Sequence, residues 1–436
     1  MALIELGDMT DARPVPVADP ITAGLDRRRV KPAVLLVVLA LVLACGGAVR
    51  PESPGLRQLW TAPYNSEKSI VLSADILYLV SGGDRAELEA FSLADGRRLW
   101  RWGTDAHLIN VNPAPGGGPV LVSVDPASAG TADGPAALAS RTTIALRAGS
   151  GAELWRHAGE PLWQGVDRDD ALLSEFDPLG GIAAVSRVRV EDGAPIWTSR
   201  GSTVREAIVE IAGGRLNRVI TRTTAGDVTV LRHADGTREA AAARLAPVKD
   251  GYNDFGARDG RLWVAASEPD SAGPTPVGVY RLDTLTESVR HDDITNCGTI
   301  ICSWGQGGFL ALDPANGREL WRSPEIIASV VTDDRLLTDQ QTGSEHTLLD
   351  SRTGRALSGS VHGWVAWADR WDDEILLLRP SAEPIGRTAV TRIDLRTGRT
   401  DLLGSLEPLP DQQSCRTTPG YLICTGWDRV IVAAVP

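Results

Sequence analysis

The fold of this 436-residue chain is decided by a repeated stretch whose clearest copy reads Leu310-Ala311-Leu312-Asp313-Pro314-Ala315-Asn316-Gly317-Arg318-Glu319-Leu320-Trp321. Apolar residues alternate before Asp313, and this pattern predicts a β-strand. Asp313 and Gly317 predict a tight turn, because a carboxylate can cap the N–H groups of a turn and glycine can adopt positive φ. The chain then re-enters as a strand that ends at Trp321. The stretch therefore predicts one β-hairpin.

The same phrase recurs along the chain, with a tryptophan four residues after a glycine. Four copies keep this pair, as Gly96–Trp100, Gly151–Trp155, Gly193–Trp197 and Gly317–Trp321. Weaker copies centre on Gly236, Gly354 and Gly398, and Glu287 takes the glycine position in another. The anchors recur about every 43 residues, which is typical of β-propeller blades.

Tryptophan is unusually frequent, with 13 Trp against 4 Phe and 5 Tyr. One hairpin per repeat, preceded by another pair of strands, gives a four-stranded sheet that must stack on its neighbours. Tryptophan suits such stacking, because it is large and flat and its N–H can reach a backbone carbonyl. We expect a structural, blade-docking role for Trp60, Trp100, Trp155, Trp197 and Trp321.

Residues 55–60 echo residues 95–100, so we expect the N-terminal strand to complete a final blade with strands from residues 414–435. Eight phrases plus this closing blade would give nine. We expect about eight four-stranded blades, on the interpretation that the short step from 287 to 317 holds no full blade; seven or nine remain alternatives. The predicted fold class is an all-β β-propeller over residues 56–436.

The phrase A-x-D-x-x-(T/N)-G-x-x-x-W resembles the tryptophan-docking repeat of the PQQ-like, or quinoprotein-alcohol-dehydrogenase-like, β-propeller superfamily. The resemblance covers residues 56–436, is specific for fold and is weak for function. It implies two function classes, a partner-binding scaffold and a quinone-dependent dehydrogenase. The dehydrogenases carry two adjacent cysteines beside the quinone, and no two cysteines are adjacent here. We therefore expect no cofactor and no catalytic residues.

The residues before the predicted propeller contain a membrane-targeting segment. Residues 33–49 carry no charge and follow an Arg/Lys cluster at residues 27–31, and about 17 apolar residues is the lower limit for a spanning helix. The positive-inside rule leaves residues 1–31 as a disordered cytoplasmic tail. We expect a transmembrane signal anchor over residues 32–49, a linker over 50–55 and an extracytoplasmic propeller at the cytoplasmic membrane of a bacterium.

Two other exported forms stay open. Residues 42–45 (Val-Leu-Ala-Cys) resemble a bacterial lipobox, which would make Cys45 a lipidation site, and a cleaved signal peptide is the third form. All three forms export the other four cysteines to a compartment where disulfides persist. We expect the pairs Cys297–Cys302 and Cys415–Cys424, each within one hairpin.

Charge and composition restrict the partners. The net charge of −12 argues against nucleic acid, which binds basic surfaces. The six histidines are scattered singly, so we expect no metal site. An enrichment at Trp364, Trp367 and Trp371 lies beside four acidic residues. We expect these tryptophans to pack between blades; the alternative is an aromatic, acidic mouth that binds a peptide or sugar.

The preferred function is a non-catalytic, membrane-tethered interaction or envelope-assembly scaffold with protein partners in the cell envelope. It resembles the scaffold proteins of this superfamily, such as the propeller lipoprotein of bacterial outer-membrane assembly machinery, which bind partners through blade loops. The expected N-terminal anchor departs from that lipoprotein, so its outer-membrane role is not carried over. The alternative is a propeller that binds PQQ or another small ligand and acts as an oxidoreductase. Convergent carboxylates and a stacking tryptophan in the central funnel would favour the alternative.

Overall fold

The computed structural model describes eleven stretches of the chain, namely residues 55–82, 85–125, 135–246, 255–265, 275–305, 308–324, 328–332, 334–339, 345–368, 373–409 and 414–436. The predicted cytoplasmic tail, the predicted transmembrane segment and Cys45 lie outside these residues. Within them, no helix is long and apolar enough to cross a membrane.

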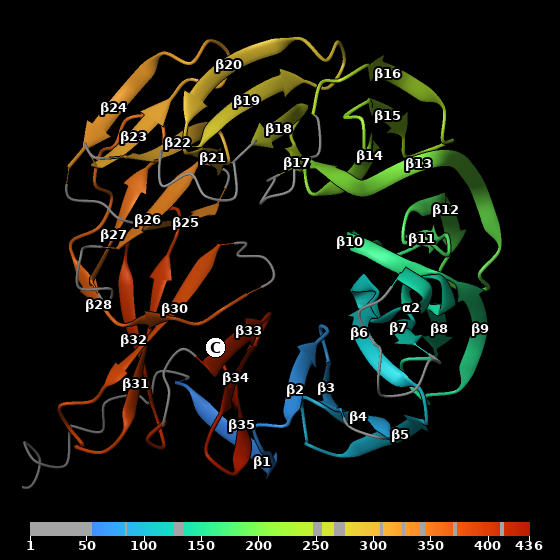
Figure 1. Ribbon diagram of the computed structural model, residues 1–436. Helices are drawn as coiled ribbons and strands as arrows, with labels where there is room; N and C mark the ends of the chain where they lie inside the picture. Colours follow the sequence, from blue (N-terminus) through green and yellow to red (C-terminus); the bar gives the residue numbers. More distant parts are fainter. Residues whose placement is uncertain are drawn as a thin grey trace, which may run out of the picture. The chain divides into compact units, whose positions relative to one another are not determined.

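Four-stranded antiparallel units follow one another along these stretches (Figure 1). Unit 1 contains β2 (Lys68–Leu72), β3 (Ile76–Ser81), β4 (Ala86–Ser92) and β5 (Arg98–Thr104). Unit 2 contains β6 (His107–Pro113), β7 (Val120–Asp125), β8 (Thr142–Leu146) and β9 (Glu153–Ala158). The short helices η1 (Pro115–Gly117) and α2 (Pro135–Ser140) flank β7.

Units 3, 4 and 5 merge into one eleven-stranded sheet. Unit 3 contains β10 (Glu160–Val166), β11 (Asp170–Phe176), β12 (Ile182–Arg189) and the first part of β13 (Pro195–Ala212). Unit 4 contains the rest of β13, β14 (Arg215–Thr223), β15 (Val228–Arg232) and β16 (Arg238–Ala242). Unit 5 contains β17 (Phe255–Arg258), β18 (Arg261–Ala265), β19 (Pro276–Arg281) and β20 (Glu287–Asp292).

Units 6 to 8 are again separate sheets. Unit 6 contains β21 (Ile294–Cys297), β22 (Ile300–Gly305), β23 (Gly308–Leu312) and β24 (Glu319–Ser323). Unit 7 contains β25 (Ala328–Thr332), β26 (Arg335–Asp339), β27 (Glu345–Asp350) and β28 (Val361–His362). Unit 8 contains β29 (Trp364–Val365), β30 (Glu374–Pro380), β31 (Thr388–Asp394) and β32 (Thr400–Leu406).

Unit 9 joins the two ends of the described chain. It contains β33 (Cys415–Thr418), β34 (Tyr421–Thr425), β35 (Arg429–Ala434) and β1 (Arg57–Pro63). β1 pairs antiparallel with β35, and Arg57 lies opposite Ala434. In Figure 1 the blue β1 accordingly lies beside the red β35. The predicted closure by the N-terminal strand is therefore present in the structure.

The hydrophobic core lies between consecutive units. Each of nine clusters of buried apolar side chains joins one unit to the next, and the last joins unit 9 to unit 1. Strand β3 shows how, since Leu77 and Leu79 pack on unit 9 while Tyr78 and Val80 pack on unit 2. Successive side chains of a strand point to opposite faces. The described units thus close into a ring, the arrangement of a β-propeller.

The described residues contain nine four-stranded units, so the preferred count of eight is wrong and the alternative of nine matches the structure. The step that we expected to hold no full blade contains unit 6. Four strands fit there because β20 ends at Asp292, β21 begins at Ile294, and the turn after Cys297 is short, with Gly298 at a φ of 72°.

The assignment of Glu287 to the glycine position is also wrong. Leu285 takes that position, with a φ of 51° and an N–H that donates to the Arg281 carbonyl. Gly317 makes the same bond to Asp313. The position four residues after Leu285 is Val289, which packs on Gly317 where other units carry tryptophan.

Candidate functional site

The tryptophans of the repeat lie between consecutive units. Each donates its indole N–H to a backbone carbonyl three residues before the glycine of the next unit: Trp60 to Leu93 (2.8 Å), Trp100 to Ala148 (2.5 Å), Trp155 to Val190 (2.8 Å), Trp197 to His233 (2.8 Å) and Trp321 to Ser351 (2.7 Å). A Cβ on any of the five facing glycines would lie 2.6–2.8 Å from the indole ring. These residues hold blades together and make no site.

The two disulfides stabilise the fold and form no candidate site. Cys297 is bonded to Cys302, and Cys415 to Cys424, which are the predicted pairs. The first closes the hairpin β21–β22, and the second joins directly opposed residues of β33 and β34. All four residues are buried.

Junction 3–4, between units 3 and 4, contains a buried acid. Asp170 is 5% exposed, and its carboxylate oxygens lie 2.5 Å from Nη2 of Arg187 and 2.9 Å from Nε2 of His233. Burial alone would raise the pKa of Asp170, but the hydrogen bonds from His233 and Arg187 outweigh it and lower the pKa below its ordinary value. Because the carbonyl of His233 also accepts the indole N–H of Trp197, this group is part of the blade contact.

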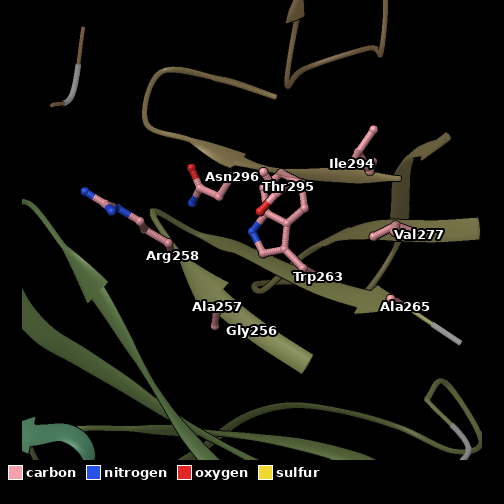
Figure 2. Close-up of a pocket in the computed structure, with 9 residues that line it drawn as sticks. All are labelled: Gly256, Ala257, Arg258, Trp263, Ala265, Val277, Ile294, Thr295 and Asn296. Atoms are coloured by element: carbon pink, nitrogen blue, oxygen red, sulfur yellow. The ribbon is translucent and has the colours of Figure 1, made fainter. Parts of the chain in front are cut away.

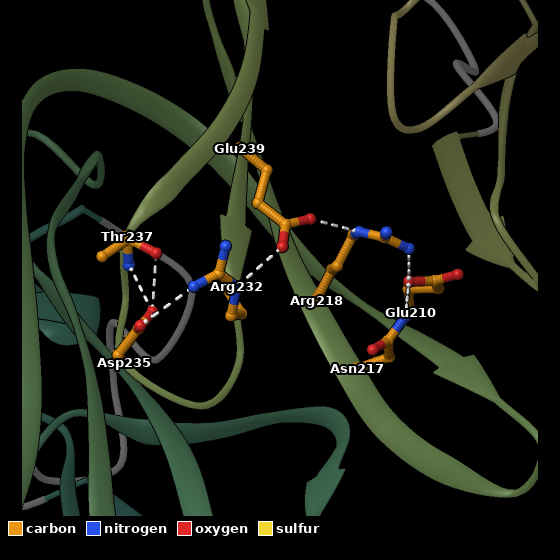
Figure 3. Close-up of polar contacts among 7 residues, drawn as sticks. All are labelled: Glu210, Asn217, Arg218, Arg232, Asp235, Thr237 and Glu239. Carbon is orange, nitrogen blue, oxygen red and sulfur yellow. Dashed lines mark hydrogen bonds and ion pairs between the residues drawn. The ribbon is translucent and has the colours of Figure 1, made fainter.

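Junction 4–5, between units 4 and 5, lacks a docking tryptophan and uses a buried ion pair. Glu210 is fully buried, and its Oε2 lies 2.9 Å from both Nη1 of Arg218 and Nδ2 of Asn217. Its Oε1 accepts the backbone N–H of Gly260 in unit 5 at 2.5 Å. Figure 3 shows that Arg218 also reaches Glu239, at 2.6 Å. The hydrogen bond from Arg218 is the main reason that the pKa of Glu239 is lowered.

One candidate cavity lies between units 5 and 6 and has a volume of about 200 Å³. Its apolar lining comes from Ala257, Ala265, Val277 and Ile294, and its polar lining from Arg258, Trp263, Thr295 and Asn296, with Gly256 completing the wall (Figure 2). We call this space the Trp263 cavity. No aspartate or glutamate is among these lining residues.

Trp263 is 7% exposed, and its indole N–H has no hydrogen-bond partner among the described residues. A buried donor without a partner costs about 1–3 kcal/mol. In Figure 2 the indole nitrogen is on the side of the ring toward Arg258 and Asn296. Oδ1 of Asn296 accepts the Gly298 N–H at 2.8 Å, so this side chain offers its amide N–H groups elsewhere. The cavity is therefore lined mainly by donors and apolar groups.

A second candidate site surrounds Trp367. Its side chain is 60% exposed, while its backbone is held by β33: the Trp367 N–H donates to Cys415, and the Thr417 N–H donates to Trp367, at 2.9 and 2.6 Å. Trp367, Ala368, Arg416, Thr417 and Leu72 line a hollow of about 100 Å³. We call these five residues the Trp367 patch. It presents a tryptophan and an arginine on a fixed backbone.

The expectation that Trp367 packs between blades is wrong, since most of its side chain faces solvent. Trp364 is partly buried in β29, and Trp371 lies outside the described residues. The sequence reading gave no role to Trp263 or Glu210. Trp263 could have been noticed as a tryptophan on a second strand, away from the repeat position. Glu210 carries no such signal, because its partner Gly260 is 50 residues away.

Across the described residues, no group of three or more His, Cys, Asp and Glu side chains could hold a metal ion. The convergent carboxylates that would have favoured the quinone alternative are likewise not among the residues that line the two hollows.

No protein-family model and no curated protein matches this chain. Solved structures with similarity include BamB from Moraxella catarrhalis, at 12% identity over 87% of this chain and 99% of that chain, with a TM-score of 0.42. The computationally designed Ika8 protein matches at 12% identity over 87% of this chain and 100% of that chain, with a TM-score of 0.46. A eukaryotic initiation factor matches at 10% identity over 80% and 88%, with a TM-score of 0.48. Similarity of this degree identifies no family and carries no conclusion about function.

Proposed function

We propose that this chain is a non-catalytic interaction scaffold, a PQQ-like propeller tethered to the outside of a bacterial cytoplasmic membrane by residues 32–49. The tether, its orientation and the family rest on the sequence alone. The observation that carries the scaffold role is the Trp367 patch. It combines an exposed tryptophan with an arginine, and both residue types are enriched among the residues that dominate the binding energy of protein interfaces.

The fixed backbone supports the same role. Trp367 forms a parallel bridge with Arg416, and the adjacent Cys415 is bonded to Cys424. A side chain on a backbone held in this way loses less conformational freedom when a partner binds, and this lowers the entropic cost of association. The hollow beneath it can receive one side chain of a partner protein.

Site-specific photo-crosslinking in intact cells tests the proposal. A photoreactive amino acid at Ala368 should give a discrete protein adduct, which Trp367→Ala should remove. The matched control places the same group at Ile385, which is 89% exposed and lies outside the patch. Failure of Ala368 to give an adduct, or an adduct of equal intensity in Trp367→Ala, contradicts the role of the patch.

The quinone alternative is tested on the purified full chain. Addition of PQQ and calcium should produce no saturable dye reduction with small alcohols or sugars. Quinone-dependent turnover would overturn the scaffold proposal and establish the oxidoreductase alternative.

A further inference from the structure

The Trp263 cavity has a chemistry that the scaffold role does not use. We infer that it binds a small uncharged molecule, in which a carbonyl oxygen accepts the indole N–H of Trp263 and a short aliphatic group packs against the apolar wall. The cavity places this buried N–H, which has no partner among the described residues, beside aliphatic side chains of β18, β19 and β21.

The cavity is open on one side and closed on the other. Four lining residues from β17 and β21 are partly exposed, namely Gly256, Ala257, Thr295 and Asn296. Four others are buried, namely Trp263, Ala265, Val277 and Ile294. In Figure 1, β17 and β21 lie on the inner side of their units, so the cavity opens toward the inside of the ring.

The polar end of the ligand must be a hydrogen-bond acceptor. The indole of Trp263 can only donate, and because it is 7% exposed, leaving its N–H without a partner is unfavourable. Oδ1 of Asn296 already accepts the Gly298 N–H, and Thr295 adds a hydroxyl to the lining. A carbonyl oxygen satisfies the indole N–H and has a second lone pair for another donor.

The ligand is uncharged because the cavity offers no counter-charge beside the indole. No aspartate or glutamate is among the described lining residues, so a cation would be buried without an anion. Arg258 is in the lining, but it forms an ion pair with Asp259 at 3.5 Å, and in Figure 2 its guanidinium is directed away from the indole. A carboxylate at Trp263 would therefore lose its hydration without being paired, which costs far more than the burial of a neutral carbonyl.

The walls and the volume define the rest of the ligand. Ala265, Val277 and Ile294 belong to the apolar cluster between units 5 and 6, so this end of the cavity favours a hydrocarbon group. A volume of about 200 Å³ equals the share of roughly six or seven water molecules in the liquid. That space fits a carbonyl group together with a branched aliphatic group of about four carbons.

Three matched probes test the inference, namely 4-methylpentan-2-one, 3-methylbutanamide and 3-methylbutanoate. They share an isobutyl group and a carbonyl, and differ only in the methyl group, NH₂ group or ionised oxygen on the carbonyl carbon. The full chain, labelled with ¹⁵N-tryptophan in mild detergent, reports binding through its indole N–H signals, and Trp263→Phe assigns the signal of Trp263. The ketone and the amide should shift this signal saturably. The carboxylate should bind about tenfold more weakly or worse, because it must bury an unpaired charge.

Trp304 is the control within the same chain. Its indole N–H is also buried without a partner in the described residues, but Trp304 does not line this cavity. Its signal should not move with any of the three probes, whereas a general effect of the probes on the protein would move both signals.

Gly256 offers a way to fill the cavity without changing its donor. It lies opposite Trp263 in the β17–β18 ladder, and side chains of directly opposed residues lie on the same face of a sheet. A Cβ at Gly256 would meet no atom within 4 Å, so a leucine there would extend into the open space. Gly256→Leu should abolish binding of the ketone, while an unchanged Trp304 signal shows that the chain is still folded.

Trp263→Phe tests the hydrogen bond and keeps an aromatic ring in place. Saturation-transfer NMR, which detects the ligand, should show ketone binding about fivefold weaker than in the native chain, the effect of one neutral hydrogen bond. An unmoved Trp263 signal with ketone and amide, or a carboxylate that binds as tightly as the ketone, would overturn the inference. So would ketone binding that is unchanged in Trp263→Phe or that survives in folded Gly256→Leu. Each of these results would leave a hydrated cavity.

Discussion

Two junctions of the ring hold neighbouring sheets together with different residue types, one with a docked tryptophan and the other with a buried glutamate. Between units 1 and 2, Trp100 lies against Gly151, and its N–H reaches the Ala148 carbonyl. Between units 4 and 5, the corresponding position is Ala240, and the fully buried Glu210 instead joins Arg218 to the backbone of Gly260. The comparison teaches that a sheet needs a partner on each face but that no single residue type is required to provide it.

Besides its apolar cluster, the ion-pair junction has two further supports. Ile211 of β13 forms a parallel bridge with Arg258 of β17, and the guanidinium of Arg222 lies 4.5 Å from the centre of the Phe255 ring. A buried ion pair must repay the loss of hydration of both charges. A docked indole has no such cost, since it buries apolar surface and satisfies its one donor.

The largest expected effect is the removal of a docked indole. Trp100→Ala should lower the free energy of unfolding by about 3–5 kcal/mol, because it leaves a cavity between two sheets and an unpaired carbonyl. Urea-induced unfolding of the full chain measures this loss. Trp427→Ala is the control, since this side chain is 85% exposed, and should change stability by less than about 0.5 kcal/mol. Equal losses in the two variants would contradict the docking role of Trp100.

The second prediction concerns the ion-pair junction. Glu210→Ala should cost about 3 kcal/mol, the lower end of the range for a broken buried pair, because Arg218 keeps Glu239 as a partner. Glu210→Gln should cost less, since it keeps an acceptor for the Gly260 N–H. A stability of Glu210→Ala equal to that of the native chain would show that the apolar cluster and the β13–β17 contacts hold this junction without the ion pair.

The repeat was readable from the sequence because its parts are local. Trp155 is the fourth residue after Gly151, and the same spacing recurs in other units, so the docking positions could be predicted. The network at Glu210 occurs once and joins residues 50 positions apart, so no pattern marks it. Unit 6 was missed for another reason, namely that its short connections compress four strands into residues 294–323. The Trp263 cavity is lined by residues of two units and by Gly256, which has no side chain to fill it. No sequence spacing indicates such a cavity.

A third prediction isolates the fit between glycine and indole. Gly151 and Gly420 both have positive φ, at 68° and 79°, but only Gly151 faces an indole ring. Alanine should cost about 1–2 kcal/mol at either site because of the left-handed backbone. Gly151→Ala should lose roughly 2 kcal/mol more, because its Cβ would overpack against Trp100. Urea-induced unfolding of the two variants gives this difference directly, and losses of the same size would show that the indole can shift aside.

The smallest expected effect is a pH dependence at junction 3–4. The pKa of Asp170 is lower in the folded chain than its ordinary value of 3.8. Its ionised form therefore stabilises the fold above about pH 4, and this contribution is lost as the pH falls through the lowered pKa. Asp170→Asn should be less stable than the native chain at pH 7, and this difference should shrink toward pH 3. A difference that is constant over this range, measured by thermal unfolding, would contradict the ionised role of Asp170.

The closed ring is the claim on which both kinds of junction depend, and the contact of β1 with β35 tests it most directly. Arg57 lies opposite Ala434, whereas Arg429 lies opposite Pro63 at the other end of the pair, about 20 Å from Arg57 along the strand. Arg57→Cys with Ala434→Cys, in a Cys45→Ser background, should form a disulfide under mild oxidation, detected by non-reducing peptide mapping. Arg57→Cys with Arg429→Cys should not. Absence of the first disulfide, or equal formation of both, would contradict the ring.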